Sequence, residues 1–138
     1  MIMETINHEC YVSLEIAKLL KEAGFDWECI KIYYNYPENT DNWSLEDNYM
    51  NHHNILHVDF ALLSPTLDVA QRWLRKIKNV VLLVDFNNDE DCEENERYGV
   101  TIYTGKERII ELATYPTYEE AQEAGIKKAL EIILEKGE

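Results

Sequence analysis

Apolar residues recur at three- and four-residue intervals in the segment 64–78, and this pattern predicts an amphipathic helix. The apolar stripe consists of Leu67, Ala70, Leu74 and Ile77. Ser64 is placed to cap the free amides of the first turn, and Pro65 suits the first helical position because its φ angle is already helical. Cationic residues gather near the end of the segment, where they favour the negative end of the helix dipole.

The segment that follows, Val80–Val84, is apolar at every position. A short, β-branched run without alternation is typical of a strand that is covered on both faces. The sequence therefore predicts that this strand lies at the centre of a sheet and is reached from the helix through a very short turn.

Two further helices are predicted, one near each end of the chain. The first starts at Ser13 and ends at Gly24, which can adopt the left-handed conformation that side chains resist. The second runs from Tyr118 to about Glu135, and Thr117 precedes it at the spacing of a capping box with Glu120. Small residues on its apolar face would let this last helix lie close to a sheet.

The remaining apolar segments are short and rich in β-branched and aromatic residues, which is typical of strands. They are Cys29–Tyr34, Ile55–Ala61, Val100–Tyr103 and Glu107–Ala113. The last two form a plausible hairpin around Thr104-Gly105-Lys106, whereas the polar segments 35–54 and 87–96 are predicted to be loops. Residues 1–138 are therefore predicted to form one α+β domain. It would have a mostly antiparallel sheet of four to five strands and three helices packed on one face.

The chain is strongly acidic, with 13 basic and 27 acidic residues and a net charge of −14. This balance disfavours direct binding to nucleic acids or to an anionic membrane. It suits solubility, a basic protein partner, or mimicry of a polyanion that competes with DNA. Three scattered cysteines make no disulfide framework, and neither a leader nor a membrane-spanning apolar run is evident. We therefore expect a soluble, intracellular protein with reduced cysteines.

One cluster could support metal chemistry. If the segment around Ile55–Ala61 is extended, His53, His57 and Asp59 point to the same face of the strand and could bind a divalent ion. However, same-face residues on a strand lie roughly 6–7 Å apart, so one ion cannot easily contact all three. A metal-dependent hydrolase or nuclease is therefore the alternative hypothesis, and solvated surface histidines are the default interpretation.

Other catalytic signals are missing from the sequence. It contains neither a Gly-x-Ser-x-Gly motif nor a glycine-rich phosphate loop, and its cysteines lie in no recognisable nucleophile context. We therefore expect no cofactor and favour a protein that is not an enzyme.

Two groups of residues suit a binding surface better. Arg72, Arg75 and Lys76 form a basic group on the outward face of the predicted helix, unless they pair with the acidic segment 89–96. Trp43 and Tyr49 lie in the polar segment 35–54 and are residue types enriched at protein interfaces, unless they fold down to cover the core.

Three segments carry a resemblance to known sequences: VSLEIAKLLKEAGFD (Val12–Asp26), SPTLDVAQRWLR (Ser64–Arg75) and YPTYEEAQEAGIKKAL (Tyr115–Leu130). In this order they resemble small uncharacterised proteins of phages, prophages and conjugative elements of gut Bacteroides-type bacteria. The resemblance implies an accessory protein of a mobile element that acts in the cytoplasm of a bacterium or of the host cell of a phage, and it supplies no catalytic residues. Our leading hypothesis is therefore a non-enzymatic interaction protein that binds an unidentified protein partner, and a homodimer is a further possibility.

Overall fold

A computed structural model describes residues 10–37, 40–105 and 108–135 of the chain. The helices are α2 (Leu14–Glu22), α3 (His52–Ile55), α4 (Leu67–Ile77) and α5 (Tyr118–Glu135), with a short 3-10 helix, η1 (Glu94–Glu96). The strands are β1 (Lys31–Asn35), β2 (Trp43–Asp47), β3 (Ala61–Leu63), β4 (Val80–Phe86), β5 (Tyr98–Thr104) and β6 (Arg108–Glu111). The fold class is α+β, as predicted.

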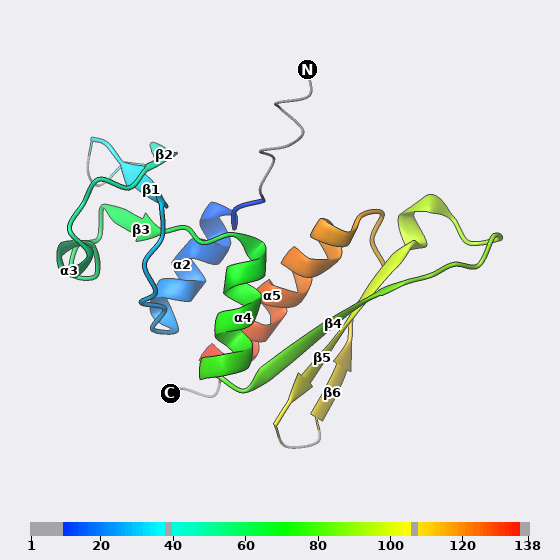
Figure 1. The fold of residues 1–138 in the computed structure, drawn as a ribbon. Coiled ribbons are helices and arrows are strands. Elements are labelled where there is room, and N and C mark those ends of the chain that lie inside the picture. The colour runs from blue at the N-terminus through cyan, green and yellow to red at the C-terminus, as the bar shows by residue number, and fades with distance from the viewer. Residues whose placement is uncertain (1–9, 38–39, 106–107, 136–138) are drawn as a thin grey trace.

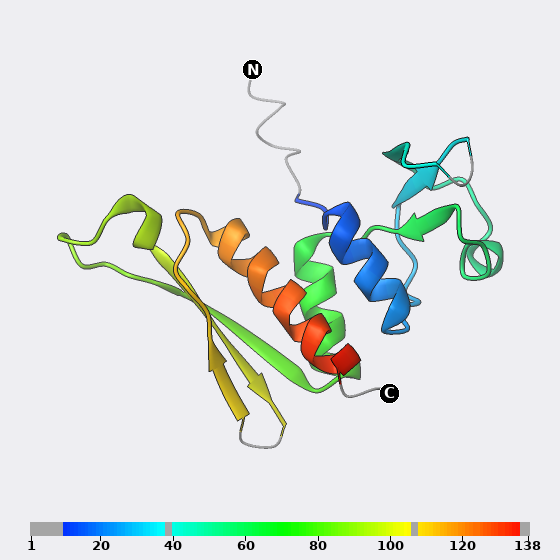
Figure 2. The same cartoon turned by 180° about the vertical axis from the view of Figure 1, so that it is seen from behind.

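The helices α2, α4 and α5 lie side by side between two small sheets (Figure 1). Seen from behind, the three helices again run in the same direction, so their N-terminal ends share one end of the molecule (Figure 2). The longest helix, α5, packs against α2, α4, β4 and β5. It therefore joins the N-terminal half of the core to the C-terminal half.

All of the described strands pair in antiparallel fashion, but they are divided between two three-stranded sheets. The first sheet has the order β2-β1-β3, and the second has the order β4-β5-β6. The sequence had predicted one sheet of four to five strands. Local patterns specify where strands form, whereas the choice of partner depends on contacts that are distant in sequence.

The helix α4 begins later than predicted. Thr66 caps it, because the Thr66 side chain accepts a hydrogen bond from the backbone N–H of Val69 at 3.2 Å. The predicted cap, Ser64, is buried, and its backbone N–H donates to the carbonyl of Lys31 at 3.1 Å. At Ser64 the chain is therefore still hydrogen-bonded to β1, and the helix begins only after its cap at Thr66.

Two turns follow the local predictions. Gly24 has a φ of +95° directly after α2. The backbone N–H groups of Gly24 and Phe25 donate to the carbonyls of Lys21 and Leu20, the two hydrogen bonds of a Schellman motif. At the end of α4, Asn79 has a φ of 61° and forms the short turn into β4.

The small residues of α5 bring it close to the second sheet. Ala121, Gly125 and Ala129 are buried on this face. A Cβ atom added at Gly125 would lie 2.8 Å from Cγ2 of Val100 on β5, which is closer than two carbon atoms can approach. The prediction that small residues allow close packing is therefore confirmed at this position.

The predictions for the middle of the chain were less accurate. The segment 35–54, predicted to be a loop, contains β2 and α3. The segment Ile55–Ala61 is not a strand, because α3 ends at Ile55 and β3 begins only at Ala61. The side chains of β2 are almost all exposed, so this strand lacks the apolar alternation by which a strand is recognised.

The strand β4 is also placed differently from the prediction. It forms an edge of the second sheet, next to β5, instead of its centre. Val80 and Leu82 are buried under the helices, but Val81 and Leu83 point to the opposite face and are exposed. The uniformly apolar run therefore has one covered face and one uncovered face.

Candidate functional site

The predicted metal-binding residues do not form a three-residue group. Because the chain turns through α3, the rings of His53 and His57 lie 4.6 Å apart, whereas the prediction placed them along a strand with Asp59. The neighbouring His52 turns inward, and its Nε2 is 2.8 Å from the carbonyl oxygen of Asp26. Within the described residues, no group of three or more His, Cys, Asp or Glu side chains is arranged to hold a metal ion. What remains is a pair of exposed imidazoles.

The predicted basic group lies on the exposed side of α4. Arg72, Arg75 and Lys76 are all exposed, and within the described residues none of them lies within ion-pair distance of a carboxylate. The acidic segment 87–96 is instead hydrogen-bonded by Arg97. The Nη1 atom of Arg97 donates to the carbonyls of Asn87 at 3.1 Å and of Asp89 at 3.3 Å.

The predicted aromatic residues have different surroundings. Trp43 is half-buried against the core, and the ammonium group of Lys18 lies 5.6 Å from its ring centroid. Tyr49 projects into solvent, and its hydroxyl donates to Asp47 at 3.3 Å. Asp47 also accepts a 2.7 Å hydrogen bond from Lys31, and this bond lowers the pKa of the Asp47 carboxyl. Trp43 partly covers the core, whereas Tyr49 remains available for contact.

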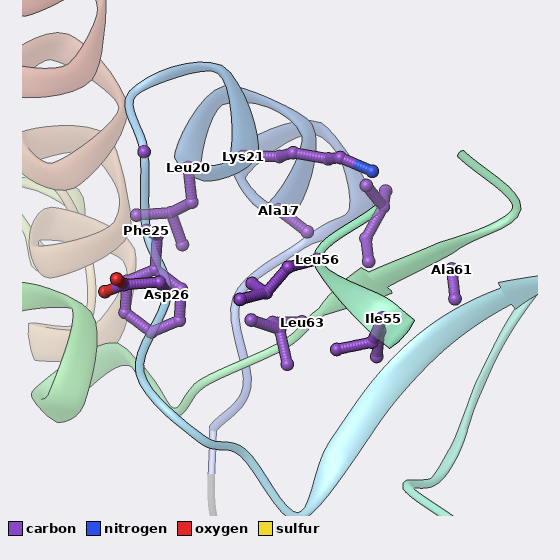
Figure 3. Close-up of a pocket in the computed structure, with 11 residues that line it drawn as sticks. Ala17, Leu20, Lys21, Phe25, Asp26, Ile55, Leu56, Ala61 and Leu63 are labelled. Carbon is purple, nitrogen blue, oxygen red and sulfur yellow. The ribbon is translucent and has the colours of Figure 1, made fainter. Parts of the chain in front are cut away.

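A cavity of about 260 Å³ opens between α2, the loop after it, α3 and β3. Figure 3 shows that Leu56 and Leu63 face Ala17 and Leu20 of α2 across this space. The side chain of Lys21 lies at its rim and donates to the carbonyl of Val58. The lining is mainly apolar, and the volume is below the roughly 300–1,000 Å³ of typical small-molecule sites. The charged residues of its lining are Lys21 and Asp26.

Carboxylates collect where the N-terminal ends of α4 and α5 meet. Burial and the nearby charges of Glu119, Glu123 and Asp68 raise the pKa of the Cys10 thiol. Beside it, the buried amide of Gln122 donates to Asp68 at 2.7 Å and to Gln71 at 2.9 Å. An elevated thiol pKa disfavours the thiolate, so this cysteine is unsuited to act as a nucleophile.

The second sheet has an uncovered face, which we call the outer face. Residues paired across antiparallel strands point to the same side, so the register defines its members. One row is Val81, Tyr103 and Ile109, and the next row is Leu83, Thr101 and Glu111. Asp85 follows on β4. The outer face therefore crosses all three strands.

The outer face is apolar at one end and acidic at the other. Its exposed fractions are 41% for Val81, 47% for Leu83, 38% for Tyr103 and 59% for Ile109. Glu111 and Asp85 border this group and are also exposed. The helices α4 and α5 pack on the opposite side of the sheet, and no described helix or strand packs on the outer face (Figure 1).

Sequence reasoning did not identify this surface. The signal was present at Val81 and Leu83, whose apolar character was interpreted as burial within a central strand. On β5, Tyr103 and Thr101 alternate with the buried Ile102 and Val100, which is typical of a strand with one covered face. Apolar residues facing away from the core are the positions that a partner could cover.

A scan against models of protein families matched none, and searches of curated proteins and of solved structures found no significant match. Among the described residues, no helix is long and apolar enough to cross a membrane.

Proposed function

We propose that this protein is a non-enzymatic accessory protein that binds a protein partner. The observation that supports this proposal is the outer face of the second sheet. It presents four exposed apolar side chains in adjoining cross-strand positions: Val81, Leu83, Tyr103 and Ile109. Contiguous exposed apolar surface on a soluble domain is characteristic of a contact surface.

The surrounding charge favours a protein as the partner. A net charge of −14 repels nucleic acid and anionic lipid, whereas it attracts a basic protein surface. The basic group Arg72, Arg75 and Lys76 lies on α4, on the other side of the second sheet from the outer face. We retain this group, together with Trp43 and Tyr49, as a second set of predicted contact positions.

The resemblance of three segments to proteins of phages and conjugative elements suggests where to search for the partner. We propose that the protein acts in the cytoplasm of a gut Bacteroides-type bacterium, alone or as a dimer, in support of a mobile element. The hypothesis of a hydrolase or nuclease has weaker support, because only two of its three residues, His53 and His57, lie together.

The proposal is tested by affinity capture from a lysate of such a bacterium, read by mass spectrometry. The variants are Leu83→Lys for the outer face, Arg72→Glu/Arg75→Glu for α4 and Trp43→Ala for the aromatic segment. Ile30→Lys is the matched control, because Ile30 is also apolar and exposed but lies just before β1, away from the second sheet.

We expect a protein that wild type and Ile30→Lys retain and that Leu83→Lys loses. If this protein is lost only with the α4 variant or only with the Trp43 variant, the contact lies on that surface instead of the outer face. If wild type retains no protein that any of these variants loses, the proposed function is wrong.

A further inference from the structure

We infer that the outer face binds an amphipathic helix whose apolar stripe is flanked by lysine or arginine at one end. This inference rests on the proposed function and adds the chemistry of the partner segment. It follows from the size of the outer face, from its charges and from what a second copy of the chain would require.

The dimensions suit a single helix. Neighbouring strands lie about 4.8 Å apart, so three strands span about 10 Å between the outer two. An α-helix with its side chains is about 10–12 Å wide. The apolar rows and Asp85 extend over five residues of β4, or roughly 13 Å, which about nine helical residues would match. The covered face of the same sheet already accommodates helices, namely α4 and α5.

The charges specify an orientation. Val81 and its partners, Tyr103 and Ile109, form the apolar end of the outer face. Glu111 and Asp85 lie toward the other end, and the acidic segment 87–96 continues beyond β4. A helix with its cations over Asp85 and Glu111 places apolar residues over Val81 and Tyr103. The reverse orientation would bury cations against apolar side chains.

A second copy of this chain fits less well. The backbone of the outer face measures about 10 Å by 13 Å, which becomes on the order of 200–300 Å² with its side chains. A stable interface buries about 800 Å² on each partner. Two copies would also bring together surfaces of the same sign, because each chain carries a net charge of −14. Both considerations favour a short basic segment over self-association through this face.

The test is selection of random 18-residue peptides displayed on phage, using the full chain as bait. Baits are wild type, Leu83→Lys and the control Ile30→Lys. Enriched peptides are then synthesised, and their affinities are measured by fluorescence anisotropy at low and high salt. Glu111→Lys reports on the acidic end of the outer face, and Glu28→Lys is its control, because Glu28 is exposed in the loop before β1.

We expect enriched peptides with apolar residues at three- and four-residue spacing and lysine or arginine at one end. Leu83→Lys should weaken their binding by about tenfold or more, as expected for a central contact residue. Glu111→Lys should weaken it several-fold at low salt and less at high salt, because salt screens exposed charges. Both control variants should bind like wild type.

The inference is overturned if the enriched peptides alternate with a period of two, lack basic residues, or bind Leu83→Lys as well as wild type. Absence of enrichment overturns it too. Affinity capture separates this failure from failure of the proposed function, since a partner lost with Leu83→Lys would still support protein binding through the outer face.

Discussion

Helix α5 lies very close to the second sheet at Gly125. One neighbouring side chain, that of Val100, decides whether replacing Gly125 by alanine stabilises or destabilises the protein. Gly125 lies in the interior of α5, where replacing glycine by alanine normally stabilises a helix by about 1 kcal/mol. Here the new Cβ would lie 2.8 Å from Cγ2 of Val100, and 3.6 Å and 3.7 Å from the δ-carbons of Leu82. Only the first distance requires atoms to move.

Val100 cannot move easily. It is 3% exposed and occupies the middle of β5, where its β-branched side chain has few alternative rotamers. Overpacking of this kind costs about 1–3 kcal/mol. Subtracting the gain in helix propensity, Gly125→Ala should leave the protein between unchanged and about 2 kcal/mol less stable.

The decisive comparison is the same substitution in a Val100→Ala background. Val100→Ala itself should cost about 2 kcal/mol because it leaves a cavity, but it also removes the atom that blocks the new Cβ. In that background only the helix propensity acts, so Gly125→Ala should stabilise by about 1 kcal/mol.

Urea-induced unfolding, followed by tryptophan fluorescence to which the buried Trp73 contributes, measures the free energies of unfolding of wild type, the two single variants and the double variant. If Gly125→Ala stabilises both backgrounds equally, Val100 does not block the new Cβ, and α5 lies farther from β5 than the 2.8 Å distance requires.

Two further predictions concern cysteine and histidine. Burial raises the pKa of the Cys29 thiol to about 12. At pH 8 this thiol should therefore form about a thousandfold less thiolate than an ordinary cysteine, and its thiolate fraction should increase about tenfold for each pH unit. Its reaction with a disulfide reagent, measured in a Cys10→Ser/Cys92→Ser variant, should be far slower in the native protein than in urea; equal rates would contradict this prediction. The second concerns the imidazoles of His53 and His57, whose ring centroids lie 4.6 Å apart and which should together bind Ni²⁺ or Zn²⁺. Either ion should then raise the thermal unfolding midpoint of wild type and of Asp59→Ala, but not of His57→Ala, whereas an equal shift in all three proteins would show that the pair is not the ligand.

The helices were predictable because their signals are local. The apolar stripe of α4, the glycine that ends α2 and the cap of α5 each depend on residues a few positions apart. The observed bond from the backbone N–H of Glu120 to the Thr117 hydroxyl, at 3.1 Å, follows the predicted spacing. The start of α4 was misplaced because Ser64 and Thr66 are both good caps, and only the pairing of Ser64 with β1 decides between them.

The sheets were less predictable because strand pairing is not local. Nothing in the run Val80–Val84 distinguishes a central strand from an edge strand with one uncovered face. The strand β2 was missed because it makes its pairs with β1 while burying almost no side chain. The same limit applies to the candidate site. The apolar character of Val81 and Leu83 is visible in the sequence, but whether this chain or another covers them depends on the whole fold.

The packing of α5 against α2 has a consequence for the order of events during biosynthesis. The elements of the first sheet leave the ribosome early, yet α2 rests on α5, the most C-terminal of the described helices. An ion pair of 3.1 Å between Lys127 and Glu15 spans the same junction, and Ile126 and Leu130 belong to the shared core. At about 5–20 residues per second, the N-terminal half spends several seconds without this support. The core shared by α2 and α5 can therefore close only after α5 has been synthesised.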